Sequence, residues 1–260
     1  MSDSLAGNNR IVIVGAGNLA TCLGEALCRA GIVPLAVWSR SEVSASQLAT
    51  KLGCPYTTCM QSLPDADIVI TAVSDDALPA VTRELVGRYS NALLVHTAGS
   101  VPMNLWAEAP AARYGVFYPM QTFSKGKSVD FSRLGIFLEA SDEDSLLQLE
   151  RLARRLTKMV YRATSAQRAY LHIAAVFSCN FTNAMYRMAA EILDNQGLPF
   201  EAMLPLIDET AAKLHHLSPD EAQTGPAARG DKEILARQSA MLDGIHRSVY
   251  DLVSEYISKK

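Results

Sequence analysis

The sequence predicts an α/β fold, in which a doubly wound and mostly parallel β-sheet is followed by an all-α domain. Short β-branched runs alternate with amphipathic stretches through residues 1–163, which is the pattern of a parallel sheet covered by helices on both faces. A glycine-rich turn follows the first run, and from Thr164 onward only helical periodicity remains. We therefore expect two domains, residues 1–163 and residues 164–260.

Composition excludes several classes of protein. The 260-residue chain has a net charge of −3 and no extended basic run, so it lacks the electrostatic footprint of a nucleic-acid-binding protein. No apolar run reaches the ~20 residues that span a bilayer, and residues 1–9 lack the apolar region of a signal peptide. The five cysteines are scattered, which is typical of reduced thiols rather than of disulfides or a metal site. We expect a cytoplasmic protein with no metal, nucleic acid or membrane partner.

The first strand and its turn form a dinucleotide-binding fingerprint. Residues 10–14 form a short run that is β-branched after Arg10, and a G-x-G-x-x-A motif follows directly, before an amphipathic helix. Gly15 permits the tight turn, Gly17 lets the backbone approach a pyrophosphate, and Ala20 allows close packing of helix on strand. The free N–H groups and dipole of the helix N-terminus favour that anion. The residues assigned to the cofactor here are Gly15, Gly17, Asn18, Leu19 and Ala20.

The end of the second strand indicates which dinucleotide binds. Residues 34–38 form this strand, and Ser39, Arg40 and Ser41 follow it. An NAD-specific site normally has a carboxylate here to bind the ribose hydroxyls, whereas a guanidinium suits a phosphate monoester. A solvent-exposed loop arginine is the alternative interpretation. We favour a site for the 2′-phosphate, and hence NADP(H) as the cofactor.

The strand–helix alternation continues through the first domain. Strands are expected at residues 67–73, 92–96, 114–118, 134–139 and 159–161, with one helix running from a Ser74 cap towards Tyr89 and another over residues 142–156. Ligands of doubly wound sheets lie beyond the carboxyl ends of the strands, so the loops after the strands at 67–73 and 92–96 should face the cofactor. The residues assigned from these loops are Val73, Ser74, Asp75, Thr97, Ala98 and Gly99.

Uncharged polar groups on the same side of the sheet are candidates for substrate binding. His96 could hydrogen-bond a substrate or order the loop that follows it, and a core histidine satisfied by the backbone is equally compatible with the pattern. Gln121 and Thr122 follow a Tyr-Pro pair and could orient a substrate or the nicotinamide carboxamide, the alternative being an ordinary polar turn. The substrate candidates in this domain are His96, Ser100, Gln121 and Thr122.

The second half contains only helical patterns. Residues 165–195 form one long, mostly apolar helix, and further helices are expected over residues 200–215 and 231–258. A helix that is apolar around much of its surface must be buried in a bundle or against another subunit, so we expect a homodimer built through this domain.

Two features of the helical half could carry chemistry. His172 shares a helix face with Cys179 and is a candidate proton donor, with the neighbouring Asn180 as a second catalytic candidate. The alternative is a core histidine bonded to a neighbouring helix. Arg229, between two glycines, could bind a substrate carboxylate, whereas Asp231 could contact substrate or cap the last helix.

Four motifs together resemble one family of NADP oxidoreductases, which pairs a Rossmann-like domain with a helical domain of uncharacterised function. They are the fingerprint, the His-x-Ala-Gly segment from residue 96, the Tyr-Pro-x-Gln-Thr-Phe-Ser segment from residue 118 and the Thr-Gly-Pro-x-x-Arg-Gly-Asp segment from residue 224. The family is similar to pyrroline-carboxylate reductase, deazaflavin-dependent NADP oxidoreductase and the β-hydroxyacid dehydrogenases. The resemblance covers nearly the whole chain. Serine is usual in the family where Ala98 stands, so no hydroxyl role is expected there.

The resemblance implies a phosphogluconate-dehydrogenase-like architecture, with a helical dimerisation domain that closes the cleft. The family does not name a substrate, and our own hypothesis is an NADPH-dependent reductase that acts on a small carbonyl or imine, such as a keto acid or a cyclic imine. The alternative is a non-catalytic NADP-binding regulator that acts through its helical domain.

Overall fold

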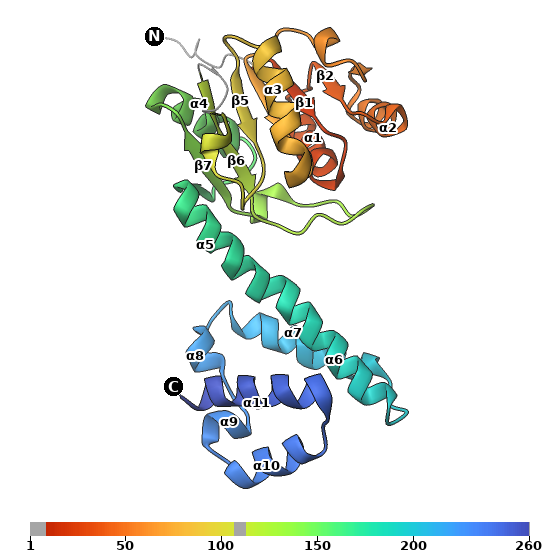
Figure 1. Cartoon of the computed structure of the whole chain (residues 1–260), viewed down its shortest axis with the longest axis vertical. Helices are drawn as coiled ribbons and strands as arrows, with labels where there is room; N and C mark the ends of the chain where they lie inside the picture. Colours follow the sequence, from red (N-terminus) through yellow and green to blue (C-terminus); the bar gives the residue numbers. More distant parts are fainter. Residues whose placement is uncertain (1–8, 107–112, 260) are drawn as a thin grey trace. The chain divides into compact units, whose positions relative to one another are not determined.

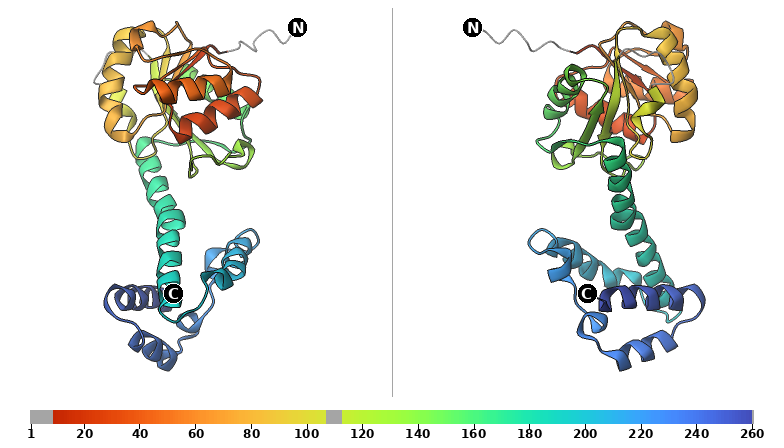
Figure 2. Two further views of the ribbon diagram at one scale, coloured as in Figure 1. Left: turned by 90° about the vertical axis from the view of Figure 1, so that its right-hand side faces the viewer. Right: turned by 60° about the vertical axis from the view of Figure 1, so that its left-hand side comes forward.

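The computed structural model describes residues 9–106 and 113–259. The chain divides into two compact units, Met1–Ala175 and Val176–Lys260 (Figures 1 and 2), and each is described here by itself. The sheet and the helices that flank it belong to the first unit. No helix of the described residues is long and apolar enough to cross a membrane.

The first unit is built on one eight-stranded sheet with the order β3-β2-β1-β4-β5-β6-β7-β8. All neighbouring strands are parallel except β6 and β7. The strands are β1 (Ile11–Val14), β2 (Ala36–Trp38), β3 (Tyr56–Thr57), β4 (Ile68–Thr71), β5 (Leu93–His96), β6 (Arg113–Pro119), β7 (Ile136–Ala140) and β8 (Val160–Arg162). The predicted doubly wound, mostly parallel sheet is therefore confirmed.

Register aligns the carboxyl ends of the central strands. Val14 of β1 pairs with Thr71 of β4, which in turn pairs with His96 of β5. The strand order reverses between β1 and β4, and open α/β sheets bind ligands in the crevice at such a reversal.

Apolar side chains of β1 point alternately to the two faces of the sheet. Ile11 and Ile13 enter one buried cluster, and Val12 and Val14 enter another. Both faces are covered, which explains why the strand is a continuous apolar run rather than an alternating one.

Helices and 3₁₀ turns flank the sheet (Figure 1). The helices are α1 (Asn18–Arg29), α2 (Glu42–Leu52), α3 (Leu78–Arg88) and α4 (Glu143–Arg154), and the 3₁₀ turns are η1 (Met60–Ser62), η2 (Asp75–Ala77), η3 (Met103–Trp106) and η4 (Phe131–Arg133). The side chains of Ser41 and Asp142 accept backbone N–H groups at the starts of α2 and α4. The expected Ser74 cap is wrong, because Ser74 precedes the η2 turn and its side chain makes no capping bond.

The long helix after Thr164 is present but not uniform. It comprises α5 (Ser165–Ala175), the π-helical segment η5 (Val176–Phe181) and α6 (Thr182–Asp194). The hydroxyl of Thr182 donates to the carbonyl of Phe177 at 3.0 Å, five residues earlier, within this wider turn. Hydrophobic periodicity does not reveal such a one-turn widening.

The rest of the second unit is a series of short helices. They are η6 (Phe200–Met203), α7 (Leu204–Lys213), α8 (Pro219–Ala222), α9 (Pro226–Arg229), α10 (Lys232–Ala240) and α11 (Gly244–Ser258). The single helix expected over residues 231–258 is wrong, since the chain turns between α10 and α11, where Gly244 has a φ of 46°.

The described residues of the second unit form no buried core of their own. Within its described residues only Ala227 is buried, whereas large apolar side chains such as Phe177, Leu206 and Leu252 are more than half exposed. Apolar surface on this scale is unusual for an independently folded unit.

Candidate cofactor-binding site

The turn after β1 is built for close approach of another backbone and of a ligand. Gly15 has a φ of 118°, and a Cβ there would lie 2.2 Å from the carbonyl oxygen of Ala72. Gly17 is the N-cap of α1, makes no side-chain capping bond, and would have open space around a Cβ. The first N–H groups of α1 are thus left without a side-chain cap, as an anion site requires.

A cavity of about 430 Å³ lies at this turn, along the carboxyl ends of the strands. Loops after β1, β2, β4 and β5 contribute to its lining, so it occupies the strand-order reversal described above. Of the residues assigned from sequence, the cavity brings together Gly15, Gly17, Asn18, Leu19, Ser39, Arg40, Val73, Ser74 and Thr97. Ala20 is instead fully buried in the core, where its small side chain lets α1 pack closely.

One corner of the cavity offers a cation and several hydroxyls. Arg40 is exposed, and it forms no ion pair within the described part of the chain. The backbone N–H of Ser41 donates to the hydroxyl of Ser39 at 3.3 Å. The hydroxyl of Ser44 contacts that of Ser41 at 3.2 Å. A phosphate monoester is the kind of group that such donors fit.

The loops after β4 and β5 are tied together. The hydroxyl of Ser100 donates to the carboxylate of Asp75 at 2.7 Å, so these two assigned residues contact each other. Asp75 and Ser100 do not line the cavity itself.

His96 orders the start of the β5 loop. Its side chain has no exposed surface, stacks on the Trp106 ring, and accepts the backbone N–H of Ala98 at 3.2 Å through Nδ1. Burial, aided by the charge of Arg168, lowers the pKa of His96 to about 3, so the ring is neutral. Of the alternatives stated above, the geometry favours loop ordering rather than substrate contact.

Arg168 is the residue that sequence reasoning missed. Its fully buried guanidinium donates through Nη1 to the carbonyls of Ala98, Gly99 and Val101, at 3.0 to 3.2 Å. Through Nη2 it donates to Glu139 at 2.8 Å and to the hydroxyl of Ser165 at 3.0 Å. The first turn of α5 therefore fixes the backbone of the β5 loop, which includes the assigned residues Ala98 and Gly99.

Gly99 is also fixed by close packing. A Cβ at this position would lie 2.6 Å from the ring of Tyr118 on β6, so no larger residue fits without displacing the ring. The sequence signal for this network was slight, namely a charged residue in the first turn of a mostly apolar helix.

His172 lies one helical turn beyond Arg168 and in the same compact unit as the cavity. Its side chain is partly buried, and its Nδ1 is buried without a hydrogen-bond partner among the described residues. Asn180, the second catalytic candidate, is exposed in η5 and belongs to the other unit.

Gln121 and Thr122 lie in the segment between β6 and β7. The Gln121 side chain accepts the backbone N–H of Thr122 at 2.9 Å, which is a local turn bond, and both residues are exposed. The next residue, Phe123, accepts the side-chain amide of Asn18 at 3.0 Å through its carbonyl. This segment therefore runs beside the N-terminus of α1.

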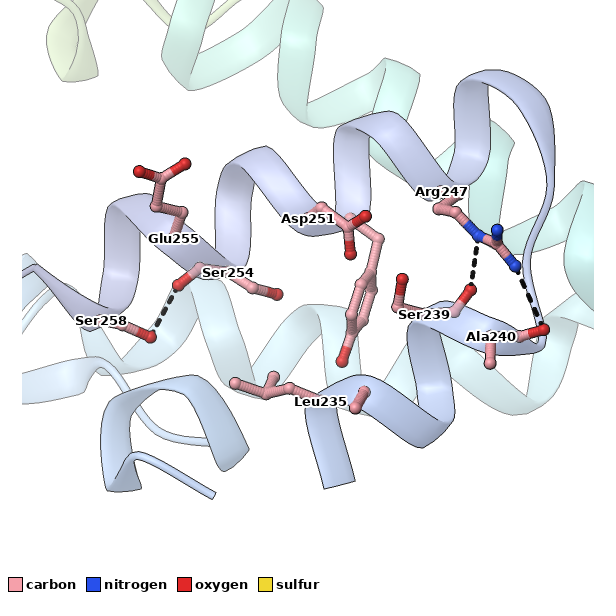
Figure 3. A pocket seen from close by; sticks show the side chains of 10 residues that line it. Leu235, Ser239, Ala240, Arg247, Asp251, Ser254, Glu255 and Ser258 are labelled. Carbon is pink, nitrogen blue, oxygen red and sulfur yellow. Dashed lines mark hydrogen bonds between the residues drawn. The ribbon is translucent and has the colours of Figure 1, made fainter. Parts of the chain in front are cut away.

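Arg229 and Asp231 pair with each other in the helical unit. The guanidinium and carboxylate are 2.8 Å apart, and Asp231 occupies the N-cap position of α10 without making a side-chain capping bond. Neither residue lines the cavity of about 510 Å³ between α10 and α11 (Figure 3). There, Arg247 donates to the carbonyls of Ser239 and Ala240, so its guanidinium is already engaged. A substrate role for Arg229 stays a prediction.

No group of three or more His, Cys, Asp or Glu side chains in the described ranges is placed to hold a metal ion. The donors at the cavity are instead backbone N–H groups, hydroxyls and one guanidinium, a set that suits phosphates.

Comparisons with known proteins agree with this geometry. Residues 2–108 match the family model for shikimate / quinate 5-dehydrogenase, and residues 134–257 match a domain of unknown function, DUF2520. No curated protein matches the chain. The crystal structure of a "putative NADP oxidoreductase" from Bacteroides fragilis is 47% identical, covers 97% of this chain and 98% of its own, and has a TM-score of 0.87. The chain belongs to this NADP oxidoreductase family.

More distant structures share the fold. An imine reductase from Myxococcus stipitatus in complex with NADP+ is 19% identical over 96% of this chain and 93% of its own, with a TM-score of 0.71. A pyrroline-5-carboxylate reductase from Coxiella burnetii is 19% identical over 98% of this chain and 100% of its own, with a TM-score of 0.62. The family resemblance drawn from the four motifs is confirmed.

Proposed function

We propose that this NADP oxidoreductase family member is an NADPH-dependent reductase of a small carbonyl or imine. The observation that carries the proposal is the cavity at the strand-order reversal, where the glycine turn of β1 and the Arg40 corner after β2 meet in one lining. A carboxylate, which NAD-specific sites place after β2, is absent from that lining in the described residues.

Different parts of the cavity lining suit the pyrophosphate and the 2′-phosphate of NADP(H). Gly15, Gly17 and the first turn of α1 bind the pyrophosphate through backbone N–H groups, and the hydroxyls beside Arg40 complete a 2′-phosphate site. The empty space beside Gly17 supports this assignment, because a side chain there would meet the ligand rather than the protein. When bound, the nicotinamide supplies a hydride to the substrate carbon.

Reduction of a carbonyl or imine also requires a proton on the oxygen or nitrogen. We assign its delivery to His172, whose partly buried imidazole makes no hydrogen bond at its buried Nδ1 among the described residues. His172 also lies four residues from Arg168, which binds the β5 loop at the carboxyl edge of the sheet. The protein otherwise orients the substrate and excludes water.

The helical unit supports a homodimer as part of the proposal. A unit whose described residues bury only Ala227 cannot stabilise itself by its own core. A second copy of the chain would cover the exposed side chains of Phe177, Leu206 and Leu252. Homodimer interfaces are apolar and resemble a domain core, which is the chemistry that these side chains offer.

Turnover on a panel of substrates tests the enzymatic claim. The panel pairs cyclic imines with keto acids and follows the loss of reduced-nicotinamide absorbance, with NADH in place of NADPH as the matched control. Oxidation of NADPH that depends on one of these substrates and is much slower with NADH supports the proposal. Tight NADPH binding without turnover on any of them would instead indicate the regulatory role.

A further inference from the structure

The segment between β6 and β7 (light green in Figure 1) is hydrogen-bonded to α1 at separate points along its middle part. The amide of Asn18 donates to the Phe123 carbonyl at 3.0 Å, and the guanidinium of Arg29 donates to the Val129 carbonyl at 3.3 Å. Phe123 and Val129 pack against the main hydrophobic cluster. The residues between them, 124–128, are therefore held at both ends.

These central residues form a tight turn that carries two lysines. The backbone N–H of Lys127 donates to the Ser124 carbonyl at 3.3 Å, which closes a four-residue turn. Gly126 occupies its third position with a φ of 76°, a conformation that this position of a type II turn requires. Lys125 and Lys127 lie on either side of that glycine.

The turn roofs a cavity of about 440 Å³ whose other walls are α1 and α2. This cavity shares Ala16, Asn18 and Ser44 with the cofactor cavity, so the two adjoin each other. Ser44 contacts Ser41 at the proposed 2′-phosphate corner. The lysine turn thus adjoins the part of the cofactor site that distinguishes NADP from NAD.

Charge favours an anion at this junction. Lys51 and Glu25 also line the second cavity, but they form an ion pair, so their opposite charges nearly cancel. Lys125 and Lys127 have no acidic partner within the described residues. A phosphate monoester carries about −1.5 to −2 charges near neutral pH, whereas Arg40 supplies a single positive charge in the cofactor cavity.

We propose that Lys125 and Lys127 are part of the cofactor site and bind the 2′-phosphate of NADP(H) together with Arg40. The inference rests on the proposed function, since it assumes that the neighbouring cavity holds the dinucleotide. The two lysines would determine cofactor specificity from a part of the chain that is distant in sequence from the fingerprint. They follow β6, whereas Arg40 follows β2, on the other side of the strand-order reversal.

Paired titrations of NADPH and NADH test this assignment. The variants are Lys125→Gln, Lys127→Gln and the double variant, with exposed Lys158, which lines neither cavity, changed to Gln as the matched control. Binding is followed by nicotinamide fluorescence, and thermal melting checks that each variant is folded. We expect the double variant to lose about tenfold in NADPH affinity, as two partly exposed charge contacts would give, and NADH binding to change less than about twofold. The Lys158 variant should match the wild type.

Two outcomes would overturn the assignment while leaving the proposed function intact. An equal loss for NADPH and NADH would place the lysines on the pyrophosphate, and unchanged NADPH binding would remove them from the site. Failure of the wild-type protein to bind either cofactor would contradict the proposed function itself, and the lysine assignment with it.

Discussion

The guanidinium of Arg168 and the carboxylate of Glu139 lie 2.8 Å apart, with the arginine side chain fully buried and that of the glutamate 16% exposed. A buried charge is tolerated only where it is paired and most of its donors are satisfied, and here Nη1 and Nη2 have partners while the buried Nε has none among the described residues. Glu139 also accepts the N–H and hydroxyl of Ser165, so one carboxylate fixes both the start of α5 and the arginine that binds the β5 loop. The helix that leads out of the first unit is thereby joined to the edge of the cofactor site.

Replacing Arg168 by methionine should strongly destabilise the first unit. The change leaves Glu139 without its charged partner and frees the carbonyls of Ala98, Gly99 and Val101, which we expect to cost about 3–5 kcal/mol in the free energy of unfolding. Urea unfolding followed by tryptophan fluorescence measures this. Arg162→Met is the control, because Arg162 pairs with two glutamates but is 47% exposed, and its loss should cost under about 1 kcal/mol. Equal effects of the two substitutions would show that the buried network is not a special source of stability.

The free energy of unfolding should decrease as the pH is lowered, because His96 is held neutral in the folded protein. Its pKa lies near 3 in the folded protein and near 6.5 when unfolded, so the unfolded chain binds the proton first. The stabilisation that comes from the neutral His96 ring is fully present above about pH 6.5 and is lost as the pH falls towards 3. Over this range the free energy of unfolding changes by at most about 1.4 kcal/mol per pH unit.

The His96→Asn variant isolates this titration. An asparagine keeps an acceptor for the Ala98 N–H but does not titrate, so its unfolding free energy should depend less on pH between about 6.5 and 4.5. Carboxylates with lowered pKa, such as Asp67 and Asp142, act at lower pH and are common to both proteins. Identical slopes for wild type and variant in this window would mean that His96 is not held neutral.

His172→Ala should lower kcat on an active substrate by about 10²-fold or more while leaving NADPH affinity unchanged, because the imidazole is assigned to proton delivery rather than to cofactor binding. Arg229→Ala should instead raise KM for an acidic substrate. Steady-state kinetics separates the two effects, and exposed His215→Ala is the matched control. A His172 variant with wild-type kcat would exclude the imidazole as the proton donor.

A charge on the exposed apolar surface of the helical unit should disrupt assembly. Phe177 is 63% exposed in the single chain, and Val33 of the first unit is 56% exposed. Phe177→Glu should dissociate or destabilise a dimer, whereas Val33→Glu should not. Light scattering across a concentration series reports the mass. A stable wild-type monomer, or equal behaviour of the two variants, would contradict a dimer built through the helical unit.

Local patterns made the cofactor side of the fold predictable. The first strand and the glycine turn are contiguous in sequence, and Arg40 follows the next strand directly, so each could be recognised from a short local pattern. The Arg168 network could not be predicted in the same way, because Glu139 and Arg168 are 29 residues apart and are brought together by the pairing of β8, which leads into α5, with β7. The lysine turn was missed for the same reason, since residues 124–128 reach α1 across more than 100 residues of chain.

The errors near helix ends also have a physical origin. Ser74 is a favourable cap residue, but a 3₁₀ turn intervenes before α3, so its hydroxyl does not meet the first free N–H groups. The π-helical segment η5 and the turn between α10 and α11 each interrupt a run that the sequence pattern predicts to be one helix, because apolar content alone does not mark a local change of helix type or a short turn.

Cofactor preference is the most direct test of the central claim, that Arg40 and its neighbours make this Rossmann site a site for NADP(H). Wild-type protein and Arg40→Asp are titrated with NADPH and NADH, and binding is followed by nicotinamide fluorescence. We predict that the wild type prefers NADPH and that the substitution weakens NADPH by about 2 kcal/mol, roughly 30-fold, with a much smaller change for NADH. Equal losses for the two cofactors, or a wild type that prefers NADH, would contradict it.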